Sequence, residues 1–343
     1  MREQISGPAF SSAAGRSCTV KFMAAVEIVV VGAGVVGLTT AISLAEAGLS
    51  TRVVAAEPPS AVTSVAAGAI WGPVRCGPDD RCYEWARTGL EVLGALADEP
   101  SAGVHQSHGR EVAQAAASPP PWAGLLPDLR LLTAAELPAG FSSGWSYTAP
   151  SVSMPVYLEY LLRRYASLGG TVGYATVTSL ASVDAPVVVN CTGIGARALV
   201  PDESLVPVRG QIVVAENPGI SEFYIDHGAE DTPDYVYAFP HGEVVILGGT
   251  AEEGASDWTP QPKVSARIMR DCAAVFPALR DARVMTERVG LRPCRPEVRL
   301  EAESLPGGRV LWHNYGHGGA GVTLSWGCAR ELTAAVLAGA RPA

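Results

Sequence analysis

The sequence predicts an α/β protein in which a strand–helix–strand domain is interrupted by a second domain built on a mixed β-sheet. Two observations carry this prediction. Residues 26–57 contain an apolar strand, a glycine-rich turn, a helix and a second strand. Residues 307–339 repeat the order of strand, glycine-rich turn and long helix, and β-rich sequence lies between the two segments. This arrangement is typical of a parallel sheet whose chain leaves to build a second domain and then returns.

The composition supports a globular protein with a substantial core. Of 343 residues, 48% are hydrophobic and 17% are charged, which is enough for one large or two ordinary domains. The net charge of -9 comes from 25 basic and 34 acidic residues, so we do not expect nucleic acid as a partner. Apolar runs are shorter than the roughly 18 residues that a membrane-spanning helix needs, so we expect no membrane insertion.

The cysteines and histidines do not form recognisable clusters. Seven cysteines are scattered without a CxxC pair, so we predict a reduced, cytoplasmic chain without a disulfide framework. His313 and His317 are separated by a glycine-containing stretch that disfavours a helix face, and no metal site is expected. Residues 1–24 lack the apolar stretch of a signal peptide; we expect a flexible extension, or a segment upstream of a natural start at Met23.

The expected elements follow in chain order. Strands are predicted at 26–31, 51–56, 185–193, 208–215 and 244–249, with short strands within 100–150. Helices are predicted at 38–47, 80–99, 155–168 and 260–276, and a last helix begins near Ser325. The stretch Arg209–Gly210–Gln211 is interpreted as a structural turn under the sheet.

The first turn has the spacing of a Rossmann-like phosphate-binding motif. Its glycines at GxGxxG spacing are Gly32, Gly34 and Gly37. The first allows a tight turn, the second lets a pyrophosphate approach the backbone, and the third lets helix and strand pack closely. Val35 and Val36 belong to the same turn, whose helix N-terminus is expected to face the phosphates. Glu57 ends the second strand and is a candidate acceptor for ribose hydroxyls, with an ordinary surface glutamate as the alternative. NAD and FAD both fit this unit.

Further motifs show a family resemblance over nearly the whole chain from about residue 26. The stretches that carry it are TSVAAGAIW (63–71), VVVNCTGIGARAL (187–199), VPVRGQIVV (206–214), ERVGLRPCRPEVRLE (287–301) and HNYGHGGAGVTLSWGCA (313–329). In their content and order they resemble the D-amino acid oxidase family, which is FAD-dependent and includes D-aspartate oxidase. The resemblance implies a discontinuous FAD-binding domain over 25–75, 154–205 and 288–340. The substrate-binding domain would then cover 76–153 and 206–287.

The resemblance also implies where FAD binds. The residues expected along the pyrophosphate and the flavin ring are Thr63, Ser64, Ala67 and Gly68, and Val177 matches the backbone position that contacts adenine. The glycine-rich turn before the last helix is expected to line the flavin through Gly318, Gly319, Gly321, Val322 and Thr323. Backbone N–H groups there could stabilise negative charge on the reduced ring, which adds Gly319 to the catalytic residues. No Cys or His is clearly placed for a covalent flavin link, so FAD is expected to bind non-covalently.

The resemblance assigns the substrate carboxylate to Arg292, because a planar, always-charged guanidinium forms two parallel hydrogen bonds. For Arg295 and Arg299 we favour ordinary salt bridges. Tyr237 matches the tyrosine that assists substrate binding. The family's second tyrosine falls on Pro233, so Tyr235 is its candidate substitute, with a packed strand aromatic as the alternative. A short lid is expected at about 226–234. Trp71, Gly72 and Val74 replace polar residues near the pocket, which favours neutral over acidic substrates.

The activity implied is oxidative deamination of neutral D-amino acids by hydride transfer from Cα to flavin N5, with dioxygen as acceptor. A D-amino acid and dioxygen are therefore the expected partners, and a homodimer is possible. Two alternatives stay open: a glycine- or sarcosine-type or specialised biosynthetic amine oxidase of the same fold, and a flavin-binding protein without turnover. An NAD-dependent dehydrogenase is a more distant one.

Overall fold

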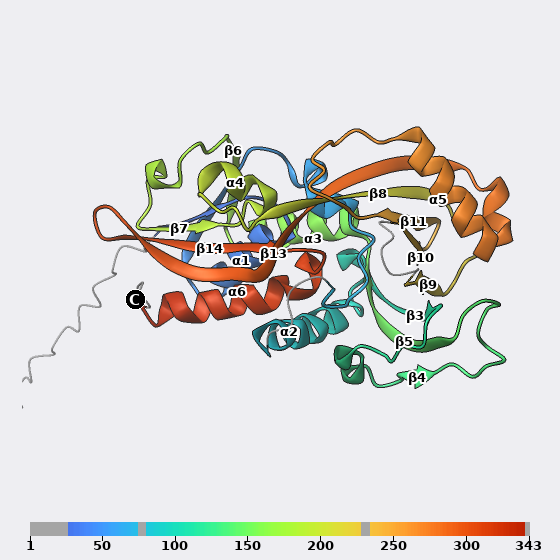
Figure 1. The fold of residues 1–343 in the computed structure, drawn as a ribbon. Helices are drawn as coiled ribbons and strands as arrows, with labels where there is room; N and C mark the ends of the chain where they lie inside the picture. The colour runs from blue at the N-terminus through green and yellow to red at the C-terminus, as the bar shows by residue number, and fades with distance from the viewer. Residues whose placement is uncertain (1–26, 75–79, 228–233, 340–343) are drawn as a thin grey trace, which may run out of the picture.

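The computed structural model describes residues 27–74, 80–227 and 234–339. The predicted α/β fold class is confirmed, because helices and a large mixed sheet together form the molecule (Figure 1). The extension expected at 1–24 lies outside the described residues. So does most of the lid expected at 226–234.

The strands belong to one continuous mixed sheet. Their bounds are β1 Glu27–Val31, β2 Ser50–Ala55, β3 Val104–Ala113, β4 Arg130–Leu131, β5 Ser143–Val152, β6 Thr171–Tyr174, β7 Val187–Asn190, β8 Val206–Glu216, β9 Phe223–Asp226, β10 Asp234–His241, β11 Val244–Thr250, β12 Glu252–Glu253, β13 Val284–Leu305 and β14 Arg309–His317. The spatial order is β4-β5-β3-β9-β10-β11-β8-β13-β14-β7-β1-β2-β6, and β12 pairs with β8.

The sheet has two parts that share β13. At one end β14, β7, β1, β2 and β6 are parallel, as strand–helix units require. At the other end most neighbours are antiparallel, apart from the parallel pair β3–β9. The 22-residue β13 pairs with β8 through its first half and with β14 through its second. A domain boundary at 287/288 would therefore fall inside this strand, and the predicted boundaries stay a prediction.

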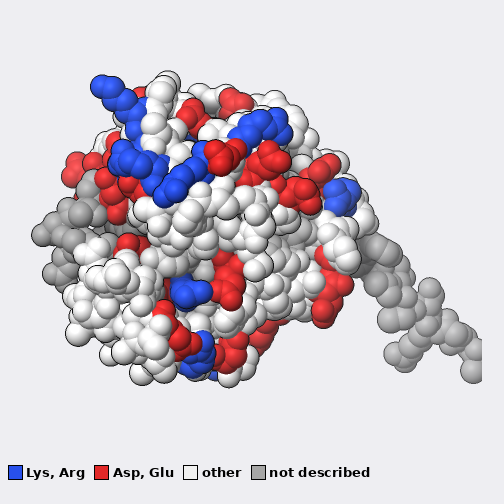
Figure 2. All heavy atoms as spheres, turned by 90° about the vertical axis from the view of Figure 1, so that its right-hand side faces the viewer, with Lys and Arg blue, Asp and Glu red and all other residues white. Residues whose placement is uncertain are grey.

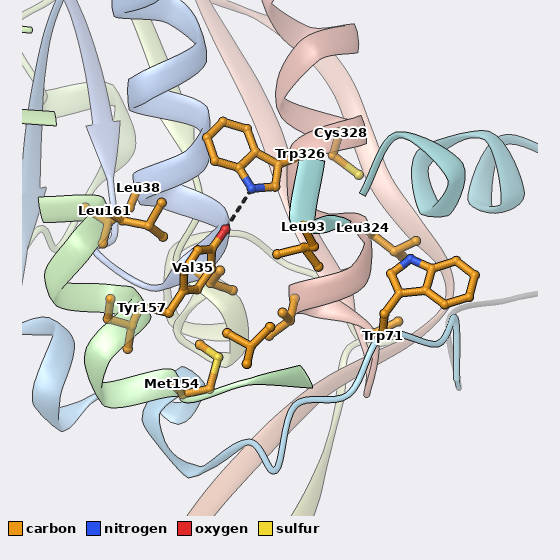
Figure 3. Packing of buried hydrophobic residues seen from close by; sticks show 14 of the residues in the cluster. Val35, Leu38, Trp71, Leu93, Met154, Tyr157, Leu161, Leu324, Trp326 and Cys328 are labelled. Carbon is orange, nitrogen blue, oxygen red and sulfur yellow. Dashed lines mark hydrogen bonds between the residues drawn. The ribbon is translucent and has the colours of Figure 1, made fainter. Parts of the chain in front are cut away.

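Helices cover the parallel part of the sheet. Their bounds, with the other helices of the chain, are α1 Val35–Glu46, α2 Asp80–Leu96, α3 Met154–Ser167, α4 Ala196–Leu199, α5 Pro262–Val275 and α6 Gly321–Leu337. α1 packs against α3 and α6, and α2 packs against α6. Figure 3 shows this core, where the indole of Trp326 donates a 2.7 Å hydrogen bond to the buried hydroxyl of Tyr157. That bond satisfies two polar groups that burial would otherwise penalise.

The antiparallel part has two faces with different partners. Alternate residues of β8 and β11, such as Val213 and Leu247, pack against α5. Residues of the opposite parity, such as Ile212 and Ile246, point away from α5 into the main core. This second face forms one wall of the cavity described below.

Several local predictions are corrected. α1 begins three residues before the expected start at 38, and α6 begins at Gly321 instead of near Ser325, because the glycine-rich turns lead directly into helices. β3 and β5 are ten residues long where short strands were expected, since each pairs along its whole length with the other. Residues 209–211 are an interior part of β8 and not a turn. Cys82 is disulfide-bonded, contrary to the expectation of a reduced chain.

Within the described ranges, we find no helix with the length and apolar character needed to cross a membrane. On the molecular face shown in Figure 2, basic and acidic side chains are interspersed.

Candidate functional site

A cavity of about 710 Å³ runs from the carboxyl ends of the parallel strands to the face of β8–β11 that lies opposite α5. The cofactor and substrate residues predicted above line it, with two exceptions, Gly37 and Trp71. The cavity therefore gathers segments from both parts of the sheet. Ligands bind at this place in α/β proteins because several strand ends and loops meet there.

The phosphate-binding turn has the geometry that its glycines predict. Gly32 adopts φ +112°, and a Cβ on it would overlap the carbonyl of Cys191 at the end of β7. A Cβ on Gly37 would overlap the carbonyl of Gly32, so this glycine allows α1 to pack on β1. Gly37 thus lies outside the cavity, where it serves the packing of α1, whereas Gly32 lines the cavity itself.

The N-terminus of α1 faces the cavity. Gly34 is the N-cap residue and has no side chain to occupy the space in front of the helix. Val35 and Val36 line the cavity, and the Val35 N–H donates a 3.1 Å hydrogen bond to Ser64 Oγ. The remaining N–H groups of the first turn and the positive end of the helix dipole make this place suited to an anion such as a pyrophosphate. Glu57 and Val177, which follow β2 and β6, lie at the neighbouring strand ends.

The segment 63–68 is attached to β13. Thr63 Oγ1 donates to the carbonyl of Leu291 at 3.3 Å, and Arg288 donates to the carbonyl of Val65 at 3.1 Å. Gly290 makes this approach possible, because a Cβ there would lie 3.1 Å from Ala66 Cβ. These contacts hold Thr63, Ser64, Ala67 and Gly68 along the cavity.

The glycine-rich turn before α6 forms the facing wall. Gly318, Gly319, Gly321, Val322 and Thr323 all line the cavity. The Thr323 hydroxyl accepts from the N–H of Gly72 at 3.1 Å and donates to the Gly72 carbonyl at 3.0 Å, so it fixes the neighbouring loop. Burial lowers the pKa of His317 to about 4, and its imidazole is therefore neutral at physiological pH.

The predicted carboxylate anchor lies at the substrate end. The Arg292 guanidinium lies over Gly210 of β8, where a Cβ would be 2.7 Å from its Cζ. One of its N–H groups donates to the carbonyl of Thr250 at 3.1 Å. Arg295 and Arg299 are paired with Asp202 and Glu301, as expected. Within the described ranges Arg292 has no such carboxylate partner, so its charge is available to a ligand.

Tyr237 lies beside this anchor. Its ring lies against Gly248 and Gly249 of β11 and stacks on Phe239 with a centroid distance of 4.7 Å. Burial raises the pKa of the Tyr237 hydroxyl, and the charge of Arg292 opposes that shift only in part. The phenol is therefore neutral and can donate a hydrogen bond. Tyr235 lines the same cavity.

Sequence reasoning misplaced one residue and missed others. Trp71 points away from the cavity: it is fully buried and its indole donates to the carbonyl of Ala86 at 2.9 Å. Trp122 lines the cavity instead, with Gly72 and Val74. Two ionisable residues that were not predicted, Glu111 and His227, also line it. Nothing in their local sequence marks them, because their place depends on strand pairing.

The cavity fits FAD. Its first half has glycine backbone at a helix N-terminus for the pyrophosphate, an acid at the end of β2 for a ribose, and a second glycine-rich wall for the ring. Its second half has an arginine that is open to a small anionic ligand. These features define a dinucleotide-dependent enzyme that acts on a carboxylate-bearing substrate.

Comparisons with known proteins identify the family. The family model "FAD dependent oxidoreductase" matches residues 27–335, and the chain belongs to this family. A D-amino-acid oxidase from Rubrobacter xylanophilus is 46% identical over 94% of this chain and 99% of its own length. The human D-aspartate oxidase is 33% identical, with 89% of this chain and 93% of its own length covered. The resemblance predicted from the motifs is thus confirmed, and FAD is the cofactor.

Solved structures agree on the fold. The glycine oxidase of Geobacillus kaustophilus superimposes with a TM-score of 0.77 over 93% of this chain and 96% of its own, at 18% identity. The glycine oxidase of Bacillus cereus gives 0.74 over 92% and 95%, at 19% identity. At such identities the likeness is one of architecture.

Proposed function

We propose that the chain is a D-amino acid oxidase that converts neutral D-amino acids, dioxygen and water to 2-oxo acids, ammonia and hydrogen peroxide. The observation that carries this proposal is Arg292. Its guanidinium has no carboxylate partner in the described part of the chain, and it shares one cavity with the phosphate-binding turn. The D-amino-acid oxidases from Rubrobacter xylanophilus and, at 48% identity, from Streptomyces coelicolor support it.

The protein residues bind and orient the substrate. Arg292 donates two hydrogen bonds to the substrate carboxylate, and Tyr237, neutral because it is buried, donates a further one. These bonds fix the Cα–H bond relative to the glycine-rich wall at Gly319, so that positioning supplies much of the catalysis. When bound along this cavity, FAD would supply the hydride acceptor for the Cα hydrogen and the means of reducing dioxygen.

The surrounding wall excludes water and sets the protonation state of the substrate. Phe239 and Val322 are buried apolar side chains on this wall. A desolvated site favours the uncharged amine of the substrate, because burial penalises an unpaired ammonium group. The nitrogen lone pair then assists loss of the α-hydrogen, and no side-chain general base is required. The imino acid product hydrolyses in water.

The test is an oxygen-consumption screen over paired D- and L-amino acids, with glycine and sarcosine included. We expect oxygen uptake and stoichiometric peroxide with neutral D-amino acids and none with their L-enantiomers. A higher kcat/KM for glycine or sarcosine than for every D-amino acid would replace the proposal with the glycine-oxidase alternative. A flavin that no amine bleaches under anaerobic conditions would exclude catalysis.

A further inference from the structure

The cavity continues beyond Tyr237 along the sheet to Glu111. Tyr237 of β10 pairs directly with Ile225 of β9, and Ile225 pairs directly with Glu111 of β3. Directly paired residues have their side chains on one face of a sheet, and all three line the cavity. With neighbouring strands about 4.8 Å apart, the main chain at Glu111 lies roughly 10 Å from that at Tyr237. A substrate held by Arg292 therefore has room for a side chain directed toward Glu111.

Glu111 is a buried acid held by two hydrogen bonds. It is 3% exposed; the Tyr147 hydroxyl donates to one carboxylate oxygen, and His227 Nε2 lies 2.5 Å from the other. The bond to Glu111 raises the pKa of His227, as expected for an imidazole beside a negative charge. Burial, together with Glu111, raises the pKa of Tyr147 well above its usual value, so this hydroxyl stays protonated and donates. Because a buried carboxylate is costly without such partners, these two hydrogen bonds compensate for the burial of Glu111, and the pair carries a net negative charge only when His227 is deprotonated.

Apolar and aromatic side chains of the described residues lie near this carboxylate. Ile225 and Trp122 line the same stretch of cavity, and the Trp145 ring lies 5.4 Å from that of His227. Arg110, which directly precedes Glu111 on β3, forms a salt bridge with Glu222 at 3.0 Å. Each carboxylate oxygen has two lone pairs, so Glu111 can accept further hydrogen bonds after those from Tyr147 and His227.

We propose that Glu111 is the distal recognition group for the substrate side chain. Its charge favours D-amino acids whose side chains end in an ammonium, a guanidinium or another hydrogen-bond donor, and it disfavours D-aspartate and D-glutamate. This inference rests on the proposed D-amino acid oxidase function and adds cationic side chains to the neutral ones. When His227 is protonated it neutralises Glu111, so the selection is strongest at moderately alkaline pH.

The test compares substrates matched in shape. At moderately alkaline pH, kcat/KM is measured for D-lysine against D-norleucine and for D-glutamate against D-glutamine, with the wild type and Glu111→Gln. The substitution keeps the size and polarity of the side chain and removes its charge. We expect the lysine/norleucine ratio to fall and the glutamate/glutamine ratio to rise, each by about 10-fold, which is a modest effect for charges a few Å apart in a partly buried site. D-norleucine itself should change little.

Glu222→Gln is the matched control, because it removes the same charge from an exposed ion pair outside the cavity. Both ratios should stay at their wild-type values in this variant. If Glu111→Gln leaves both ratios unchanged while D-norleucine is oxidised, Glu111 is only a structural link between β3 and His227, and the inference is wrong. If the variant does not fold, the wild type alone tests the inference. Its kcat/KM should be higher for D-glutamine than for D-glutamate and higher for D-lysine than for D-norleucine, and the reverse order would contradict the inference. A wild type that oxidises no D-amino acid would instead refute the proposed function.

Discussion

Replacing Arg292 tests the carboxylate anchor directly. In the structure its guanidinium donates one hydrogen bond to the Thr250 carbonyl. It lies over Gly210, which has no side chain that could occupy this space. Two charge-assisted hydrogen bonds to the substrate carboxylate then remain to be made, each worth about 1.5–3 kcal/mol. At about 1.4 kcal/mol for each factor of ten, their loss lowers kcat/KM by about 10²–10⁴. We expect Arg292→Ala to show this loss.

Arg292→Lys separates charge from geometry. A lysine keeps the positive charge but cannot form two parallel bonds, so we expect a smaller loss than for alanine, shared between KM and kcat. The assay is steady-state oxygen uptake with a neutral D-amino acid, together with the flavin absorbance of the purified protein. Flavin content should remain normal, because Arg292 is proposed to contact substrate and not cofactor.

Arg295→Lys is the control, since Arg295 lies close by on β13 but is paired with Asp202 at 2.9 Å outside the cavity. It should keep nearly full activity. Near-normal kcat/KM in Arg292→Ala would refute the reasoning, because the carboxylate anchor would then lie elsewhere.

Three further predictions concern the cofactor turn, the floor beneath the anchor and the buried imidazole. The Cβ of Gly34→Asp would lie 3.2 Å from Ser64 Oγ, a tight contact that a small shift of the serine side chain relieves, so the variant should fold. Its carboxylate would face the phosphates, and the purified protein should lack the flavin absorbance that Gly34→Ala retains. Gly210→Ala displaces Arg292, and a packing cost of about 1–3 kcal/mol should lower kcat/KM by about 10–100-fold at unchanged flavin content; unchanged kinetics would contradict the placement of the guanidinium. The pKa of His317 in the folded protein is about 4, below the usual 6.5. Between these two pH values the unfolded chain binds the proton more readily than the folded protein. The free energy of unfolding therefore falls as pH drops through this window, by up to about 3 kcal/mol. The free energy of unfolding in urea should depend less on pH in His317→Asn than in the wild type. An equal pH dependence in both proteins would contradict this prediction.

The sequence by itself determined the fold class, the family and the cofactor. These follow from short-range features: Gly32, Gly34 and Gly37 specify a turn through the conformations and approaches that neighbouring residues allow, and apolar runs specify buried strands. Motifs such as GLRPCRP and HNYGHGGAG also let family resemblance name Arg292 and the second glycine-rich wall. Such signals lie within a few residues of one another and do not depend on which strands become neighbours.

Only the tertiary structure decided what surrounds the substrate side chain. Glu111, Tyr147 and His227 come from β3, β5 and the end of β9, and they meet because these strands are neighbours in the sheet. Gly210 lies under Arg292 because β8 pairs with β13, although about 80 residues separate them. Trp122 lines the cavity and Trp71, which was expected near it, does not, for the same reason: packing and not local sequence decides which side chain faces a cavity. Long-range strand pairing is set by the packing of the whole chain, and no short stretch of sequence contains it.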